Sequence, residues 1–345
     1  MPEPIALTSP PQSRTLPRSG LSVSALGFGA APLGDLFAVL DERAAVETVV
    51  AALDAGITLI DVSPLYGHGL AEHRIGTALR QFSGLRPVIS TKIGRVLDPF
   101  QPRGNGSGYL GGLPHGARFD YSADGVMRSL EQSLLRLRID RIDIALIHDV
   151  DVWTHGDQAE SRIREALDGA YPALERLRCA GVVSAIGVGV NEADICARFA
   201  RETDMDAVLL AGRYSLLEQP ALDDFLPLAV EKRIGVMLGG VFNSGILATG
   251  AVPGAKYNYQ PAPAAVLARV RAIEAVCARH AVPLRIAALH FALAHPAVSS
   301  VVLGAVTPDE VRANVAASAA RVTPALWTEL KASGLINPDA PTPET

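Results

Sequence analysis

Residues 122–148 read SADGVMRSLEQSLLRLRIDRIDIALIH and contain the two kinds of segment that recur along the chain. A serine opens the stretch in a position to cap a helix, and Leu130, Leu134 and Leu137 follow at helical spacing. The mainly apolar run 142–147 comes next and is typical of a buried strand. A helix that leads directly into a buried strand is characteristic of parallel α/β sheets.

The same alternation extends in both directions from this stretch. A helix is predicted over 41–55, where Asp41 is a candidate N-cap and Gly56 follows the last turn. The strand candidates are 26–30, 57–60, 87–91, 142–147, 184–188, 207–210, 234–238 and 298–303. The other helical stretches are 70–80, 122–137, 160–180, 191–201, 222–232, 265–281 and 308–317. This order predicts an α/β fold, a (β/α)8 TIM barrel with long loops at its C-terminal rim, and the alternative is a doubly wound open sheet.

Composition and charge limit the kind of protein this chain can be. Of 345 residues, 49% are hydrophobic and 19% are charged, which suits a large buried core and excludes a disordered chain. The formal net charge of −5 argues against a nucleic-acid partner, which needs clustered positive charge. The chain has no apolar run of about 18 residues, so we expect no membrane span.

The cysteine content and the chain ends indicate a single cytoplasmic domain. The 3 cysteines form neither a disulfide framework nor a metal-binding spacing, which fits a reducing compartment. The first residues are rich in proline and lack the apolar core of a signal peptide. We expect a flexible tail over 1–18, one domain over 19–334 and a proline-rich tail over 335–345.

Ionisable side chains follow three consecutive strands of the predicted barrel. Asp61 closes the second strand, Lys92 the third and His148 the fourth. Tyr66 lies five residues after Asp61. Because the carboxyl ends of barrel strands share one rim, these four side chains are predicted to meet there. Taken singly they could be a structural ion pair, a loop tyrosine and a capping histidine, but their matching positions favour a catalytic site.

Proton transfer beside a hydride is the chemistry that this set of side chains suits. A free tyrosine has a pKa of about 10, and a positive Lys92 would lower the pKa of Tyr66 by stabilising its phenolate. Asp61 would pair with Lys92 and hold it in place, since neither charge is cheaply buried alone. A neutral His148 would bind and orient the substrate oxygen.

These residues lie in motifs through which the chain resembles the aldo-keto reductases. The motifs, in the family's order, are 54–67 (DAGITLIDVSPLYG), 91–92 (TK), 130–148 (LEQSLLRLRIDRIDIALIH) and 186–191 (IGVGVN). The resemblance runs from about residue 26 to 315. It implies an (α/β)8 barrel, a nicotinamide cofactor and a catalytic tetrad made of Asp61, Tyr66, Lys92 and His148.

The resemblance also implies which residues hold the nicotinamide, and here the chain departs from many relatives. A tyrosine that stacks on the nicotinamide is replaced by Gly239, the first residue of the segment Gly239-Gly240-Val-Phe242. A glutamine contact is replaced by Ala211. Asn191 remains available for the carboxamide. We therefore expect a changed cofactor pose around the nicotinamide, and not the loss of the cofactor.

The last cofactor segment indicates which dinucleotide is used. By resemblance, Gly304 and Thr307 belong to this segment and Asn314 contacts the adenine. Relatives that prefer NADP have Arg or Lys near the position of Glu310, where a carboxylate repels a 2′-phosphate and accepts hydrogen bonds from ribose hydroxyls. NAD is therefore predicted in preference to NADP. The alternatives are an ordinary solvated Glu310 and an Arg312 that turns inward.

With NAD, oxidation is the expected direction, and the chain looks like the NAD-dependent sugar dehydrogenases of the family. It shares with L-fucose or D-threo-aldose 1-dehydrogenases a long loop after Lys92 and the segments 148–155 (HDVDVWTH) and 209–219 (LLAGRYSLLEQ). The implied reaction oxidises the anomeric hydroxyl of an aldose, such as L-fucose, D-arabinose or L-galactose, to a lactone. Oxidation of pyridoxal to 4-pyridoxolactone is the close alternative, because pyridoxal presents the same ring hemiacetal. Asp149 and Trp153 are candidate substrate contacts, although Trp153 could equally be a buried loop anchor.

Several other features carry alternative interpretations. The segments 27–29 and 187–189 echo a dinucleotide fingerprint but lack its third glycine. The glycine-rich loop 104–116 is interpreted as a mobile lid rather than a phosphate cradle. A metal-dependent hydrolase site within 148–155 would need a further ligand after the first strand, so no metal site is predicted. A non-catalytic cofactor-binding subunit is the remaining alternative, against which the intact tetrad argues.

Overall fold

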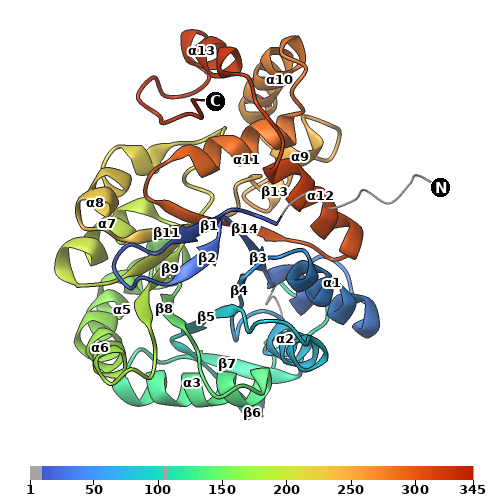
Figure 1. Ribbon diagram of the computed structural model, residues 1–345. Coiled ribbons are helices and arrows are strands. Elements are labelled where there is room, and N and C mark those ends of the chain that lie inside the picture. The colour runs from blue at the N-terminus through green and yellow to red at the C-terminus, as the bar shows by residue number, and fades with distance from the viewer. Residues whose placement is uncertain (1–9, 105–107, 345) are drawn as a thin grey trace.

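Eight parallel strands close into a barrel at the centre of the molecule, and helices surround it (Figure 1). The computed structural model describes residues 10–104 and 108–344. In barrel order the strands are β3 (Leu26–Gly29), β4 (Leu59–Asp61), β5 (Val88–Ile93), β8 (Ile144–His148), β9 (Ala185–Val190), β10 (Ala207–Ala211), β11 (Gly235–Gly239) and β14 (Val298–Gly304). Each strand predicted from the sequence is one of these, so the (β/α)8 TIM barrel is confirmed and the open sheet is excluded.

The helices begin where the sequence places capping residues. The Asp41 carboxylate accepts a hydrogen bond from the Ala44 N–H at 2.9 Å and starts α1 (Glu42–Asp54). Ser122 caps α3 (Ala123–Leu137) in the same way. Other helices on the outside of the barrel are α2 (Leu70–Gln81), α6 (Tyr171–Cys179), α7 (Ala193–Glu202), α8 (Phe225–Glu231) and α12 (Pro308–Ser318). The single helix predicted over 160–180 is instead α5 (Ala159–Glu165), a π-helical turn (Ala166–Ala170) and α6.

Besides the four-residue helices α4 (Val152–His155) and α9 (Ile246–Thr249), two longer helices in the described part of the chain were not predicted from the sequence. Helix α11 (Leu284–Ala294) is apolar on nearly all sides because it is buried between the barrel and its neighbours, so it lacks an amphipathic period. Helix α13 (Pro324–Ala332) packs against α10 (Ala264–Arg279) beyond one side of the barrel (Figure 1). None of the described helices alone is long and apolar enough to cross a membrane, and α10 with α11 passes that test only as a pair bent by 96°.

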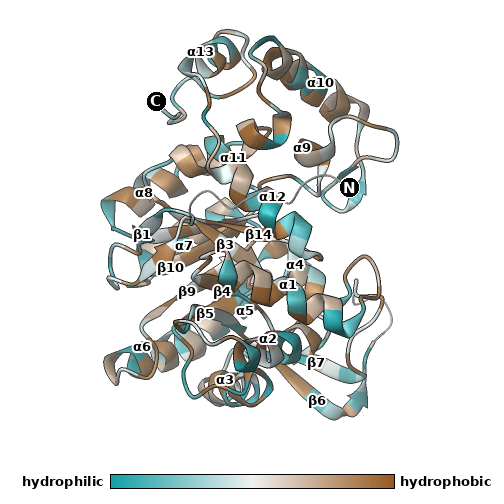
Figure 2. Cartoon of the chain, turned by 45° about the vertical axis from the view of Figure 1, so that its right-hand side comes forward, coloured by the Kyte–Doolittle hydropathy of each residue, from teal (hydrophilic) through white to brown (hydrophobic). Residues whose placement is uncertain are grey.

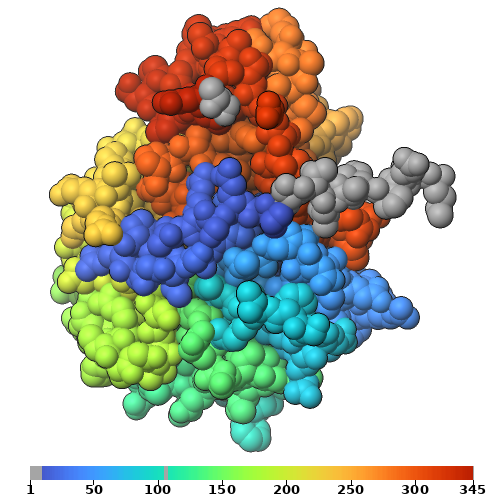
Figure 3. Space-filling view, viewed as in Figure 1, coloured from blue at the N-terminus to red at the C-terminus, as the bar shows by residue number. Residues whose placement is uncertain are grey.

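Residues 13–18, expected in a flexible tail, form part of the closed end of the barrel. Strands β1 (Ser13–Thr15) and β2 (Ser22–Ser24) make an antiparallel hairpin, and Figure 3 shows the blue N-terminal residues lying across this end. Leu16 is fully buried in the apolar cluster inside the barrel. Gly235 makes room for it, because a Cβ there would lie 2.2 Å from Leu16 Cδ2. Residues 1–9 of the expected tail lie outside the described residues.

The proline-rich C-terminal segment also packs on the protein. Ile336 and Ala340 are buried, and the Asn337 N–H donates to Gln219 Oε1 at 3.2 Å. Apolar contacts therefore hold this segment, which the sequence suggested to be a tail. Most of the apolar residues lie deeper, where Figure 2 shows the barrel strands in brown.

A hairpin extends from the rim after β5, and most of the long glycine-rich loop expected there connects its two strands. Its strands are β6 (Arg95–Pro102) and β7 (His115–Phe119). The N–H groups of Leu110 and Leu113 donate to the backbone oxygens of Asp35 and Gly67, both at 2.9 Å. The loop thus packs against the turn that carries Tyr66, as a lid would, although residues 105–107 lie outside the described part and its mobility stays a prediction.

Candidate active site

Lys92 and Asp61 form a buried ion pair at the C-terminal rim of the barrel. Lys92 Nζ lies 2.5 Å from Asp61 Oδ1 and donates to the Val62 backbone oxygen at 3.0 Å. The Ser90 hydroxyl donates to the same carboxylate oxygen at 2.7 Å. Both charged side chains are almost completely buried, 1% and 2% exposed. The predicted pairing is therefore present, with the hydrogen bonds that a buried ion pair requires.

Room for the lysine comes from a glycine of β9. A Cβ on Gly189 would lie 3.1 Å from Lys92 Cε and 3.3 Å from Lys92 Cδ. A Cβ on Gly187 would meet the Ala207 backbone oxygen at 1.7 Å. These two glycines, which echo a dinucleotide fingerprint in the sequence, are thus explained by packing inside the barrel.

Tyr66 is placed by a close contact between two backbone turns. Gly67 has a φ of +63° and lies against Gly34, the last residue of the 3-10 turn Ala31–Gly34. A Cβ on Gly34 would lie 2.4 Å from both the Tyr66 carbonyl carbon and the Gly67 nitrogen, so only glycine permits this approach. The turn places the Tyr66 ring with its centroid 6.0 Å from Lys92 Nζ.

Burial dominates the acidity of Tyr66. It raises the pKa of the phenol well above the ordinary value, and the negative charge of Asp61 raises it further. The shift is opposite to the one expected from Lys92 alone, because the lysine is bound to Asp61 and the two charges offset each other. The phenol is therefore held in its protonated form at neutral pH.

His148 completes the predicted set as a neutral imidazole. Its ring centroid lies 6.2 Å from that of Tyr66 with the rings nearly perpendicular, and burial lowers the pKa of His148 to about 3. The Tyr121 hydroxyl donates to the His148 backbone oxygen at 2.8 Å and so holds the end of β8. Asp61, Tyr66, Lys92 and His148 thus meet at one rim, as the sequence predicts.

Ser63, which the sequence did not single out, supports one tautomer of His148. Its hydroxyl oxygen lies 3.1 Å from His148 Nδ1 and accepts the Leu65 N–H, also at 3.1 Å. The Asp149 carboxylate, whose Oδ1 lies 3.5 Å from His148 Nε2, favours the tautomer with its proton on Nε2, and in that tautomer the Ser63 hydroxyl donates to Nδ1. The signal in the sequence was the Asp61-Val-Ser63 spacing, which puts the serine just past the strand end.

Replacement of Ser63 by alanine is expected to lower kcat/KM about tenfold, since the tautomer is no longer selected by a hydrogen bond of ~1.4 kcal/mol. The dissociation constant for NADH should not change. Nitrogen NMR of His148 should show a mixture of tautomers in the variant and one form in the wild type. Ser63→Thr keeps the hydroxyl and serves as the control. A single Nε2–H form in Ser63→Ala would contradict the assignment.

Asp149 lies beside His148 and is held by an arginine from the hairpin. Arg95 Nη2 lies 2.6 Å from Asp149 Oδ2, and the guanidinium stacks 4.2 Å from the centroid of the Phe119 ring. Asp149 Oδ1 lies 3.5 Å from His148 Nε2. The long loop after Lys92 therefore contributes a cation to the site, which the sequence could not assign.

Two of the four predicted side chains, Tyr66 and His148, border a groove. A cavity of about 390 Å³ is lined by Tyr66, His148 and Asp149. Aromatic and amide side chains form its upper wall, and they are Tyr109, Trp153, Asn191 and Tyr259.

The profile of the Aldo/keto reductase family matches residues 25–334. The chain belongs to this family. It is 41% identical over 337 residues to pyridoxal 4-dehydrogenase of Microbacterium luteolum, covering 94% of this chain and 98% of the relative. It is 38% identical to D-threo-aldose 1-dehydrogenase of a Pseudomonas species, covering 94% and 97%. The solved holo form of an aldo-keto reductase from Bacillus halodurans matches with a TM-score of 0.73 at 25% identity, covering 97% and 98%.

Aldo-keto reductases use nicotinamide cofactors, and a smaller cavity of about 50 Å³ extends the space beside Tyr66 and His148. This second cavity shares Trp153, Asn191 and Tyr259 with the first and continues along the barrel rim to Gly240 and Ser244. The Trp153 indole is 62% exposed, so it is a wall of the groove and not a buried anchor. Of the predicted nicotinamide and substrate residues, Asn191, Gly240, Asp149 and Trp153 line these two cavities, whereas Gly239 and Phe242 line neither.

The residues predicted for the adenosine end lie on β14 and α12. Thr307 caps α12 through its hydroxyl, and the Glu310 carboxylate accepts the Val306 N–H at 2.8 Å. Glu310 is therefore a capping residue as well as a charge at this loop. Gly304 precedes the loop and is exposed.

An arginine missed by sequence reasoning connects the two cofactor segments. Arg285 of α11 donates to the Asn314 side-chain oxygen, and its guanidinium lies 5.7 Å from the centroid of the Phe242 ring. Arg285 therefore links Phe242 and Asn314, which are 72 positions apart in the sequence.

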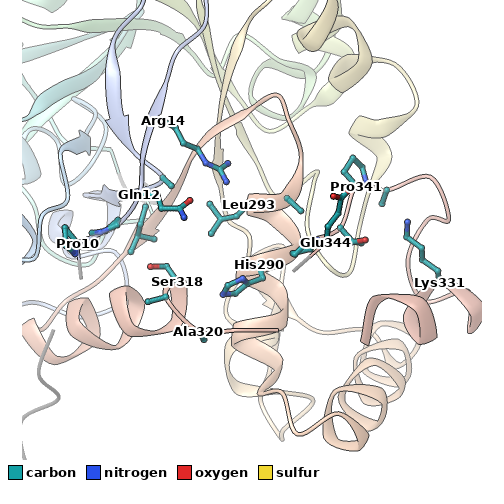
Figure 4. Close-up of a pocket in the computed structure, with 18 of the residues that line it drawn as sticks. Pro10, Gln12, Arg14, His290, Leu293, Ser318, Ala320, Lys331, Pro341 and Glu344 are labelled. Carbon is teal, nitrogen blue, oxygen red and sulfur yellow. The ribbon is translucent and has the colours of Figure 1, made fainter. Parts of the chain in front are cut away.

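A larger cavity of about 1030 Å³ lies elsewhere, between residues 10–14, α11 and the C-terminal segment (Figure 4). Arg14 in its wall donates to the backbone oxygen of Val298, at the start of β14, so this cavity is at the N-terminal end of the strands. Barrel enzymes have their active sites at the opposite end. Within the described residues, no group of three or more His, Cys, Asp or Glu side chains is placed to hold a metal ion.

Proposed function

We propose that this aldo-keto reductase oxidises the anomeric hydroxyl of a ring hemiacetal with NAD⁺ and forms a lactone. The observation that carries the proposal is the meeting of Tyr66, the Lys92–Asp61 pair and a neutral His148 at one rim of the barrel, where Tyr66 and His148 line a cavity. An aldose such as L-fucose, D-arabinose or L-galactose is the leading substrate class. The relative named D-threo-aldose 1-dehydrogenase supports that class.

The chain's own residues divide the reaction between them. His148 donates a hydrogen bond from Nε2 to the anomeric oxygen and orients it toward Tyr66. Tyr66, in its phenolate form, takes the hydroxyl proton while the carbonyl forms. Lys92 stabilises this phenolate before the proton is transferred. Asp61 keeps Lys92 charged and in place. The bound nicotinamide supplies the acceptor for the hydride that leaves the anomeric carbon.

The charges of the cavity favour an uncharged substrate. Lys92 is paired with Asp61, Arg95 with Asp149, and His148 is neutral. No cation of this set is left to bind a phosphate or carboxylate of the substrate. The Asp149 carboxylate and the Arg95 guanidinium instead offer an acceptor and donors for sugar hydroxyls.

Pyridoxal is the second candidate substrate. It is favoured by the 41% identity to a relative named pyridoxal 4-dehydrogenase. The aromatic walls Tyr109, Trp153 and Tyr259 would suit its flat ring as well as a sugar face. The tetrad reacts with the hemiacetal that both substrates share, so it does not distinguish them.

NAD is proposed as the preferred dinucleotide, because Glu310 puts a carboxylate on the loop that would receive a 2′-phosphate. The nearby Arg312 is engaged by Asp309. Glu310→Arg is expected to raise kcat/KM with NADP about tenfold to a hundredfold, through one charge-assisted contact. Glu310→Gln keeps the capping acceptor without the charge and should show a smaller gain. An unchanged NADP efficiency in both variants would contradict the role of Glu310.

The decisive experiment is NADH formation, followed at 340 nm, with L-fucose, D-arabinose, L-galactose and pyridoxal, and with NADP in parallel. Rapid turnover of a sugar with NAD supports the aldose dehydrogenase. Rapid turnover of pyridoxal alone keeps the mechanism and changes the substrate. Inactivity with all hemiacetals, in a preparation that binds NADH, would favour a non-catalytic cofactor-binding subunit.

A further inference from the structure

Tyr259 lies on a tight turn that is fastened above the groove. The turn joins β12 (Lys256–Tyr257) to β13 (Gln260–Pro261), and Asn258 and Tyr259 have φ values of +48° and +63°. The Tyr259 N–H donates to the Ser244 hydroxyl oxygen at 3.0 Å. These constraints place the tyrosine where the groove passes from the tetrad toward Gly240.

The Tyr259 ring faces ligand space. It lines both cavities of the groove, together with Asn191 and Ala211. Its side chain is 61% exposed, whereas Tyr121, Tyr214 and Trp327 are buried. The negative charge of Asp149 acts on its hydroxyl, which puts the phenol near the catalytic end.

The position of the missing stacking tyrosine is left open by the fold. A Cβ on Gly239 would meet Ala211 Cβ and Leu209 Cδ2 at 3.6 Å, which is ordinary contact. Packing therefore does not require glycine at this position. Gly239 and its neighbour Ala211 leave this wall without a large side chain, and Tyr259 lines the adjoining cavity together with Ala211 and Gly240.

We propose that Tyr259 supplies the aromatic face against which the nicotinamide packs, in place of the tyrosine that is absent at Gly239. This inference rests on the proposed function only in requiring a bound nicotinamide dinucleotide. A phenol ring attracts the flat nicotinamide by stacking, and attracts its oxidised, cationic form by a cation–π interaction. The neighbouring Asn191 would then hold the carboxamide in the plane of that stack.

The test compares two ligands that differ in the nicotinamide. Dissociation constants for NADH and for ADP-ribose are measured by fluorescence and calorimetry, without substrate. Tyr259→Ala is expected to weaken NADH binding about tenfold and to leave ADP-ribose binding unchanged. Tyr259→Phe keeps the ring and should bind both ligands like the wild type. Equal weakening of both ligands, which would indicate a phosphate clamp, overturns the proposal, as does unchanged NADH binding with a raised KM for substrate.

A rescue variant separates stacking from a general loss of structure. Gly239→Tyr, added to Tyr259→Ala, restores a ring to the open wall and is expected to recover most of the NADH affinity. A melting temperature close to that of the wild type checks that the variants fold. Failure of the rescue in a folded variant counts against stacking as the source of the affinity. A wild type that binds no NADH would instead overturn the proposed function itself.

Discussion

Tyr66→Phe is expected to lower kcat about 10³-fold while the dissociation constant for NADH stays within about twofold. The variant keeps the ring that lines the cavity and removes the hydroxyl that is proposed to take the substrate proton. Single-turnover hydride transfer, followed at 340 nm, measures the chemical step directly. Tyr109→Phe removes a hydroxyl from the same cavity and is the matched control. If both variants lose equal activity, Tyr66 is not the acid/base.

The same residue determines the expected pH profile. Burial raises the pKa of Tyr66, so below that pKa the phenolate fraction grows about tenfold with each pH unit. The kcat/KM for oxidation is therefore expected to rise into the alkaline range. His148, whose pKa burial lowers to about 3, contributes no inflection near neutral pH. A midpoint of about 6.5, the ordinary histidine value, would contradict this account.

Lys92→Met is expected to cost both activity and stability. It removes the cation beside Tyr66, with a loss of about 10³-fold in kcat, and leaves the buried Asp61 carboxylate without its partner. An unpaired buried charge lowers the free energy of unfolding by about 3–5 kcal/mol. Urea unfolding and steady-state kinetics measure the two effects separately.

A double variant distinguishes the structural role of the pair from its chemical role. Lys92→Met with Asp61→Leu removes both charges and should regain most of the lost stability, since apolar residues replace a buried ion pair at little cost. Its activity should stay as low as that of Lys92→Met. Recovery of activity in the double variant would show that Lys92 only neutralises Asp61.

The strand pattern predicted the barrel because strands buried on both faces are short apolar runs bounded by glycine or polar residues. Amphipathic helices such as α3 were predicted because their apolar residues recur at helical spacing. Helix α11 was missed because burial on all sides removes the period on which the prediction depends. The N-terminal hairpin was missed because its strands are only three residues long, and the burial of Leu16 depends on the space that the distant Gly235 leaves for it.

The tetrad was predictable because Asp61, Lys92 and His148 lie at the ends of strands that share one rim. Tyr66 follows Asp61 by only five residues. Ser63, Arg95 and Tyr259 were not predictable in the same way. Their roles depend on contacts far along the chain. Arg95 pairs with Asp149, 54 positions away, Ser63 contacts His148, 85 positions away, and Tyr259 lines a cavity with residues of other loops.

The sequence by itself determined the order of strands and helices, the rim at which Asp61, Tyr66, Lys92 and His148 meet, and the family, because these depend on local periodicity and spacing along the chain. Only the tertiary structure decided the protonation of the site. Burial, which no local pattern records, raises the pKa of Tyr66 and lowers that of His148, and pairing with Asp61 offsets the charge that Lys92 was expected to exert. The solvent that each group loses on folding is a property of all the chain packed around it.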